Sequence, residues 1–203
     1  MIEVEAKFRL SDVEAFEHLL ISLGGSLPGR LLHQSDEYFQ HPCRSFDQTD
    51  EALRLRTVAE ASPSGEACPE QLELCYKGPR LDPSTKTRRE IEFTTLALAA
   101  ETGTPQKQSV EALRNILLTL GFSSAGWVRK KRRAFDILFE NQSVCVSVDY
   151  VDGLPPFAEL EIVCSESQRA EATSRILRLA ETLGLRDSER RSYLELLENQ
   201  PHS

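Results

Sequence analysis

Apolar residues recur at helical spacing in three segments of the chain. Each segment carries apolar side chains three or four residues apart, with polar residues between them, and each ends at a Leu-Gly pair. The first opens with Ser11 and Glu14 at the spacing of a capping box. The pattern therefore predicts helices over residues 11–23, 109–120 and about 167–183.

Between these segments the apolar residues alternate with polar ones, which is the period of a β-strand with two different faces. Stretches rich in turn residues, 61–69 and 78–86, predict hairpin loops, and residues 102–108 predict a linker. No strong boundary divides the chain, so we expect a single domain over residues 1–203. The eight predicted strands cover residues 3–9, 35–40, 52–57, 71–77, 88–94, 128–139, 144–151 and 157–164.

Charged residues occupy the polar face of seven of these strands. On the first strand Glu3, Glu5 and Lys7 share one face, opposite Val4 and Ala6. The other same-face groups are Arg54 with Arg56, Glu73 with Lys77, Arg88 with Glu90 and Glu92, Lys130 with Arg132, Ser147 with Asp149, and Glu159 with Glu161.

For any single strand, a solvated outer face explains such charges adequately. Across the whole set, acids grouped with acids and bases with bases favour a closed sheet. Its charged faces would line the interior, and its apolar faces would point outward beneath the helices. We therefore predict an α+β fold, a closed or nearly closed eight-stranded antiparallel β-barrel with helices packed outside. Lys131 and Arg133, of opposite parity to Lys130, should face outward.

An interior crowded with like charges is costly unless a ligand neutralises it. A polyanion with bound divalent metal would do so, because Lys and Arg neutralise phosphate oxygens while carboxylates supply the hard oxygen ligands that Mg²⁺ or Mn²⁺ prefers. The alternative is that these acids and bases form ion pairs with one another between strands.

The composition excludes several other classes of protein. The net charge of −8 argues against a sequence-independent nucleic-acid binder, which needs a basic surface. No apolar run approaches the length of a membrane span and none resembles a signal peptide, so we expect no membrane partner and a cytoplasmic location. The five cysteines are scattered, which predicts ordinary thiols and neither a disulfide nor a zinc site.

These motifs resemble the CYTH superfamily, the triphosphate tunnel metalloenzymes. The segment Glu3-Val4-Glu5-Ala6-Lys7 matches the E-x-E-x-K signature of that superfamily. Its support is a series of companion motifs in order along nearly the whole chain. They are Asp36-Glu37-Tyr38-Phe39, Leu53-Arg54-Leu55-Arg56, Tyr76-Lys77-Gly78-Pro79, Arg88-Arg89-Glu90-Ile91-Glu92, Val128-Arg129-Lys130-Lys131-Arg132, Val148-Asp149 and Phe157-Ala158-Glu159-Leu160-Glu161.

The resemblance implies a role for each charged group. The divalent metals would be held by Glu3, Glu5, Asp149, Glu159 and Glu161, with Glu90 or Glu92 contributing. The triphosphate would be bound by Lys7, Arg54, Arg56, Lys77, Arg88, Lys130 and Arg132. The catalytic residues would be Glu5, Lys7 and Glu159. Tyr38 and Tyr193 are expected to pack in the core or at the rim.

The closing segment from Arg191 to Leu197 resembles the end of bacterial class IV adenylyl cyclases. This resemblance favours a cyclase as the interpretation, an enzyme that converts ATP to 3′,5′-cyclic AMP and pyrophosphate with Mg²⁺ or Mn²⁺. One alternative is a triphosphatase that hydrolyses thiamine triphosphate, inorganic tripolyphosphate or a nucleoside triphosphate. Another is a sensor that binds a polyphosphate or nucleotide without turning it over. In each case the partner is a small-molecule triphosphate.

Overall fold

The computed structural model describes residues 2–25, 30–60, 71–81, 85–95 and 105–200. The predicted hairpin loop at 61–69 lies outside these residues, as do Cys68 and the first part of the predicted linker.

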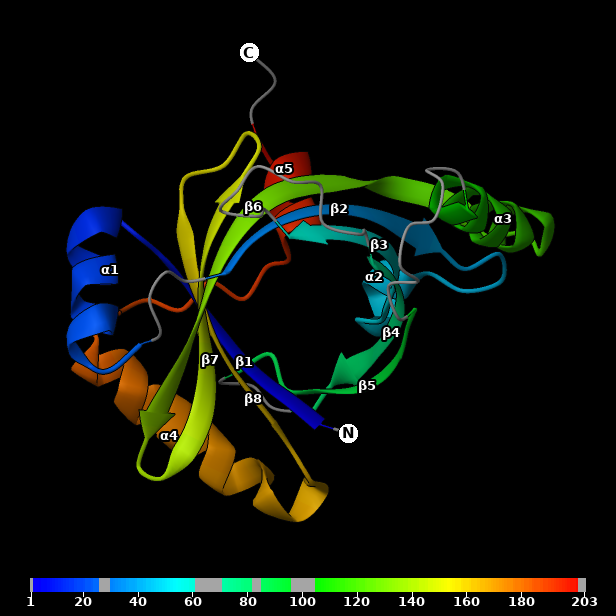
Figure 1. Cartoon of the computed structure of the whole chain (residues 1–203). Coiled ribbons are helices and arrows are strands. Elements are labelled where there is room, and N and C mark those ends of the chain that lie inside the picture. The colour runs from blue at the N-terminus through cyan, green and yellow to red at the C-terminus, as the bar shows by residue number, and fades with distance from the viewer. Residues whose placement is uncertain (1, 26–29, 61–70, 82–84, 96–104, 201–203) are drawn as a thin grey trace.

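Eight antiparallel strands close into a barrel, as the charge alternation predicts (Figure 1). Around the barrel they follow the order β1-β5-β4-β3-β2-β6-β7-β8. Their bounds are β1 Ile2–Arg9, β2 Arg30–Gln40, β3 Ala52–Glu60, β4 Gln71–Arg80, β5 Arg88–Thr94, β6 Ser123–Phe139, β7 Gln142–Val151 and β8 Phe157–Cys164.

β2 and β6 both begin five residues earlier than the alternation predicts. They pair with each other from Arg30 opposite Ala134 to Gln40 opposite Ser123, with a register shift after Tyr38. Pairing between distant segments therefore extends both strands into stretches where apolar and polar residues no longer alternate cleanly.

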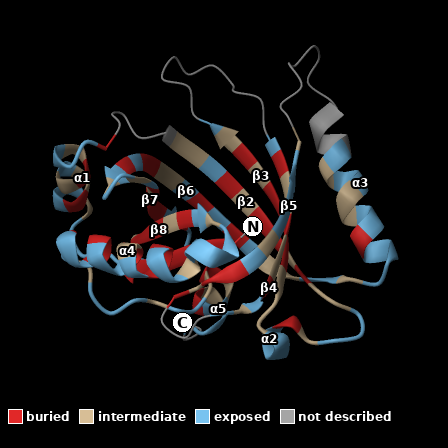
Figure 2. Ribbon diagram, turned by 90° about the horizontal axis from the view of Figure 1, so that it is seen from below, coloured by how far each residue is buried: buried red, intermediate tan, exposed pale blue. Residues whose placement is uncertain are grey.

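The main hydrophobic core lies outside the barrel wall (Figure 2). Val4 of β1, Val146 of β7 and Leu160 of β8 are buried on the outward face of the sheet. α1 (Val13–Ser22) and α4 (Arg169–Thr182) cover them with Leu20 and Ile176. A second core lies under α3 (Pro105–Thr119), and α2 (Phe46–Thr49) contributes to it. This arrangement leaves the charged faces of the strands for the interior.

Two helix boundaries differ from the prediction. α1 is capped by Asp12, whose side chain accepts a hydrogen bond from the backbone N–H of Ala15 at 3.0 Å, and not by Ser11. α3 begins at Pro105, so residues 105–108 of the predicted linker are helical. Proline favours the first helical position because its missing N–H has no partner there in any case.

The last helix, α5 (Tyr193–Glu198), was not predicted as a helix and lies at one end of the barrel interior (Figure 1). Tyr193 and Leu196 pack against Val128, Val151 and Phe157. Those three residues share the parity of Lys130, Asp149 and Glu159, which is the inward face. A short 3-10 helix, η1 (Glu166–Gln168), precedes α4.

Candidate functional site

The barrel interior holds a cavity of about 440 Å³ whose described lining is almost entirely charged. Nine bases and seven acids line it, and the other lining residues are Tyr38, Ala52, Val163, Ser192 and Tyr193. The bases are Lys7, Arg54, Arg56, Lys77, Arg80, Lys86, Arg88, Lys130 and Arg132. The acids are Glu3, Glu5, Glu73, Glu90, Glu92, Glu159 and Glu161.

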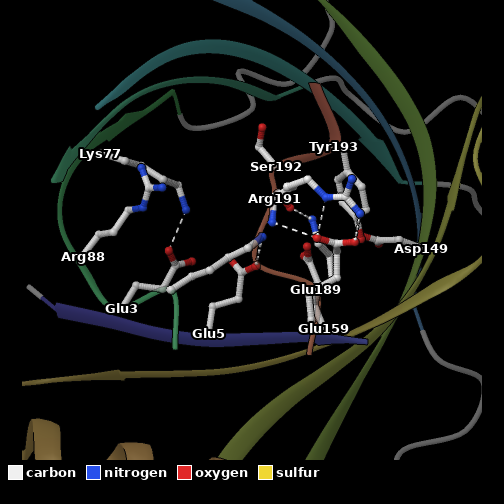
Figure 3. Close-up of polar contacts among 12 residues, drawn as sticks. Glu3, Glu5, Lys77, Arg88, Asp149, Glu159, Glu189, Arg191, Ser192 and Tyr193 are labelled. Carbon is white, nitrogen blue, oxygen red and sulfur yellow. Dashed lines mark hydrogen bonds and ion pairs between the residues drawn. The ribbon is translucent and has the colours of Figure 1, made fainter. Parts of the chain in front are cut away.

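β1 directs Glu3 and Glu5 into this cavity (Figure 3). Lys77 Nζ lies 2.6 Å from Glu3 Oε2 and also pairs with Glu90. Lys86 Nζ lies 3.0 Å from Glu5 Oε1. Burial opposes ionisation of Glu3, but the charge of Lys77 and hydrogen bonds from its neighbours outweigh it and lower the pKa of Glu3 to about 2. Glu3 is therefore a carboxylate at neutral pH.

A second cluster joins β6, β7 and β8 around Asp149. Both of its oxygens accept hydrogen bonds: Oδ1 from Arg132 at 2.7 Å, and Oδ2 from Lys130 at 3.0 Å and from Arg132 at 2.6 Å. The Tyr193 hydroxyl also donates to Oδ2 at 2.9 Å (Figure 3). Arg132 pairs with Glu159 as well. Burial opposes the charge on Asp149, yet Arg132 and Lys130 lower its pKa.

β2 and β3 supply a third group. Asp36 accepts two hydrogen bonds from Arg56, at 2.6 and 2.7 Å, in the bidentate geometry typical of arginine and carboxylate. Arg54 lies 3.7 Å from Glu73, and its Nε has no hydrogen-bond partner among the described residues. Part of the guanidinium of Arg54 is thus left to bind an anion.

Arg191 and Ser192, just before α5, lie in the barrel interior near Glu5 and Glu159 (Figure 3). The Lys7 ammonium donates to the carbonyl oxygen of Arg191 at 2.6 Å and lies 3.9 Å from the centre of the Tyr193 ring. Burial and the neighbouring charge of Lys86 lower the pKa of Lys7 to about 6. The site thus holds a strongly desolvated amine that an anion would stabilise in its charged form.

The carboxylates of β1 and β8 fit a divalent cation. Glu5 lies directly opposite Glu161 in the strand register, which places like charges next to each other. Glu161 forms no ion pair with a described residue, and burial together with the nearby Glu3 raises its pKa to about 8. Four carboxyl groups, those of Glu3, Glu5, Glu159 and Glu161, thus line one region, and among the described residues only Glu161 of these four lacks a paired base. Their oxygens are ligands that Mg²⁺ and Mn²⁺ accept.

The structure brings nearly all the predicted site residues into this one cavity. Asp149 is the exception: it is completely buried behind Lys130 and Arg132 and does not line the cavity. Arg88 lines the cavity and also donates to the carbonyl oxygen and to the carboxylate of Asp50, both at 3.0 Å. Lys131 is exposed on the outer face, and Arg133 pairs outside the barrel with Glu17 of α1.

Sequence reasoning missed Arg80 and Lys86, which both line the cavity. Counting alternate residues from Lys77 would place Arg80 outside, but the register shifts between Lys77 and Arg80, and this irregularity turns Arg80 inward. Lys86 comes from the predicted loop 78–86, to which the period-two rule does not apply. The Gly78-Pro79 pair within the strand signals the irregularity.

Cys43, Cys75 and Cys164 form no disulfide with another described residue. None of the helices within the described residues is long and apolar enough to cross a membrane.

A closed antiparallel barrel with a charged interior of this size defines a class of proteins that bind a small polyanion inside the sheet. The CYTH domain family matches residues 1–193, and the chain belongs to this family.

Two curated relatives match the chain over nearly its whole length. A protein of Methanocaldococcus jannaschii named "Putative adenylate cyclase" is 31% identical over 199 residues, covering 97% of this chain and 98% of its own. Adenylate cyclase CyaB of Aeromonas hydrophila is 30% identical over 200 residues, covering 97% and 88%.

Two solved structures share the fold. A protein of Pyrococcus horikoshii superposes with a TM-score of 0.75 at 33% identity, covering 97% of this chain and 98% of its own. A protein of Hippeastrum superposes with a TM-score of 0.56 at 17% identity, covering 97% of this chain and 95% of its own. It is named a "putative adenylyl cyclase" and described as having a dominant triphosphatase activity. The second likeness concerns the fold alone.

Proposed function

We propose that this protein is a divalent-metal-dependent enzyme that acts on a triphosphate bound inside the barrel, with the reaction of a class IV adenylyl cyclase. The observation that carries the proposal is the single cavity in which nine bases face seven acids. A triphosphate has enough charge to engage several of these bases at once, while the acids of β1 and β8 supply metal ligands.

The site residues fall into groups that bind the phosphates, bind the cation or position other side chains. Lys7, Arg54, Arg56, Lys77, Arg88, Lys130 and Arg132 hold and align the phosphates. Glu3, Glu5, Glu159 and Glu161 hold the cation, which when bound neutralises phosphate charge and lowers the cost of charge transfer. Asp149 keeps Lys130 and Arg132 in position. Glu5, Lys7 and Glu159 lie closest to the reaction in this scheme. Because phosphoryl chemistry depends on alignment and charge neutralisation, no protein nucleophile is required.

The two curated relatives named adenylate cyclase support the cyclase reaction, in which the ribose 3′-oxygen attacks the α-phosphorus and pyrophosphate leaves. The second candidate is hydrolysis of the terminal phosphate. It is favoured by the lining itself, because few of the described lining residues are apolar or aromatic side chains on which a nucleobase could pack. The same bases could hold a triphosphate in either position relative to the attacking oxygen.

The deciding experiment incubates the purified chain separately with ATP, thiamine triphosphate and tripolyphosphate, with Mg²⁺ or Mn²⁺, and identifies the products. A cyclase gives 3′,5′-cyclic AMP and pyrophosphate from ATP. It accepts a β,γ-methylene analogue and fails with an α,β-methylene analogue, because the methylene then replaces the oxygen of the bond that must break. A triphosphatase shows the reverse sensitivities and releases orthophosphate. Binding of all three compounds without any product would identify a sensor.

Metal dependence is tested with the same substrates. Excess EDTA should abolish turnover, and Glu3→Gln and Glu161→Gln should reduce it by at least about a hundredfold because each removes a carboxylate ligand of the cation. Glu111→Gln is the matched control, since Glu111 is exposed on α3 outside the barrel. Turnover that persists in EDTA would contradict the proposal.

A further inference from the structure

The wall formed by β4 and β5 holds a group of potential metal ligands next to the carboxylates of β1, to which Glu90 is connected through Lys77. Cys75, Glu90 and Glu92 each offer one ligand atom, and these atoms all lie within 4.8 Å of one another. Cys75 is directly opposite Glu92 in the strand register. It shares the parity of Glu73 and Lys77, so its side chain is on the inward side of β4.

The thiol of Cys75 has no partner in the described structure. Its side chain is completely buried, and no hydrogen bond from or to the sulfur connects it to a described residue. The two carboxyl groups beside this thiol, those of Glu90 and Glu92, carry like charges when both are ionised, and a bound cation would relieve their repulsion.

The two carboxylates are incompletely neutralised. Glu90 shares the ammonium group of Lys77 with Glu3, so one cation serves two acids. Glu92 is exposed to the cavity, accepts a hydrogen bond from the hydroxyl of Thr94 at 3.0 Å, and forms no ion pair within the described part of the chain. Burial and the hydrogen bond with Glu3 raise the pKa of Glu90 to about 8, so a bound cation would stabilise the ionised form of this carboxyl group.

We propose that Cys75, Glu90 and Glu92 form a second metal site that binds a thiophilic divalent cation such as Zn²⁺. A thiolate is a soft ligand and selects zinc-like cations over Mg²⁺, which the all-oxygen region of β1 and β8 suits better. The sulfur forms its bond to the cation as its proton leaves to solvent. Burial raises the pKa of the Cys75 thiol to about 11, and the charge of Arg54, opposite Cys75 in the register, only partly opposes this, so the bound cation itself must displace the proton.

The geometry is close to what zinc requires. Zinc bonds of about 2.3 Å to sulfur and about 2.1 Å to oxygen place tetrahedral ligand atoms about 3.6 Å apart, so the ligand atoms, which lie within 4.8 Å of one another, must approach by at most roughly 1 Å. Glu92 is free to rotate because it is exposed, and Glu90 is half-buried. Three protein ligands leave the fourth position to water. The spacing of the cysteines in the sequence does not reveal this site, because its ligands come from two neighbouring strands.

The test titrates the metal-free full chain with Cd²⁺ and Co²⁺ and follows the absorption of thiolate-to-metal charge transfer. We expect a saturable band that persists in excess Mg²⁺. Cys75→Ser should abolish it, while Cys43→Ser, which alters an exposed thiol, should leave it unchanged. Binding and not turnover is measured, so the result is independent of the proposed triphosphate chemistry.

Glu92→Gln distinguishes a metal site formed by several ligands from metal binding by the Cys75 thiol alone. It should weaken Cd²⁺ binding by about tenfold or more, whereas Glu111→Gln on α3 should have no effect. A band that survives Cys75→Ser, or an affinity unchanged by Glu92→Gln, would overturn the proposal. Circular dichroism checks that each variant is folded, and Glu92→Gln decides the question if Cys75→Ser does not fold, because Glu92 is exposed.

Discussion

At the scale of single residues, the barrel interior is built from ion pairs that differ in how firmly each partner is held. Asp36 is 1% exposed and accepts both of its close hydrogen bonds from Arg56. Burial opposes its charge, but Arg56 and Arg54 hold the pKa of Asp36 well below its usual range. Asp36 does not line the cavity, so its role is to fix Arg56 in place.

Asp36→Asn should destabilise the fold by about 3–5 kcal/mol at neutral pH, because it removes the bidentate partner of the buried Arg56 and leaves only the longer contact with Glu73 at 3.7 Å. Since the folded-state pKa of Asp36 is depressed, its contribution is complete above the unfolded pKa of about 4 and is lost as the pH falls below it. The difference in unfolding free energy between wild type and variant should therefore shrink in acid. Urea unfolding at several pH values measures it.

Asp136→Asn is the matched control, since Asp136 is exposed on β6. It should change stability by less than about 0.5 kcal/mol at every pH. If Asp36→Asn lowered the unfolding free energy by the same amount at every pH, the substitution would be removing packing and not the ion pair.

Asp149 offers a second prediction, because sequence reasoning assigned it to the metal and the structure surrounds it with bases. If it positions Lys130 and Arg132, Asp149→Asn should lower stability by several kcal/mol (about 3–5) and weaken triphosphate binding, with no change in the number of Mn²⁺ ions bound. Tyr193→Phe removes one of the hydrogen bonds to Asp149 and should cost only about 1 kcal/mol. Loss of a bound Mn²⁺ in Asp149→Asn, counted by equilibrium dialysis, would restore the metal role.

At the scale of elements, the alternation along seven strands predicted the barrel because their charged residues follow the same inward and outward rule. Lys130 and Lys131, adjacent in the sequence, face opposite sides as their parity requires. The rule fails where an element depends on distant contacts. Arg80 turns inward at an irregularity, and α5 is a short helix that becomes buried only because the barrel end can receive it. Neither depends on a local period, so a single sequence does not show them.

α5 should stabilise the barrel from within. Leu196 is 5% exposed and packs with Tyr193 against inward-facing apolar residues. Leu196→Ala should cost about 2–5 kcal/mol, because it leaves a cavity at the end of the barrel. It should also weaken triphosphate binding, since Tyr193 and the backbone of Arg191 contact Lys7. Leu177→Ala on α4, where the leucine is 42% exposed, is the control and should change both quantities little. Thermal unfolding and calorimetric binding measure the two effects.

At the scale of the whole molecule, the charge is distributed unevenly. The chain carries a net charge of −8, yet its described cavity lining has nine bases to seven acids. The exterior is thus more acidic than the cavity lining. This contrast disfavours extended polyanions such as nucleic acids, which would meet the acidic surface first, and admits a small anion that fits within about 440 Å³.

Tripolyphosphate with Mg²⁺ should therefore raise the unfolding temperature. A ligand at a hundredfold excess over its Kd stabilises the folded state by about 2.7 kcal/mol. Lys130→Gln should largely remove this shift, and Lys131→Gln, one residue away on the outer face, should retain it. Differential scanning calorimetry gives both values, and equal shifts in the two variants would contradict binding inside the barrel.

The seam where the barrel closes is narrow. β1 pairs with β5 at only two positions, Ile2 with Arg89 and Glu3 with Arg88, whereas it pairs with β8 at eight. The seam is otherwise tied by the Lys77–Glu3 and Lys86–Glu5 ion pairs and by the backbone bond from Lys86 to Glu5 at 2.9 Å. The side chains of these two ion pairs are among those that would contact a bound anion and cation. The rate at which the backbone amides of β1 and β5 exchange hydrogen with solvent should therefore change when a ligand binds in the barrel interior.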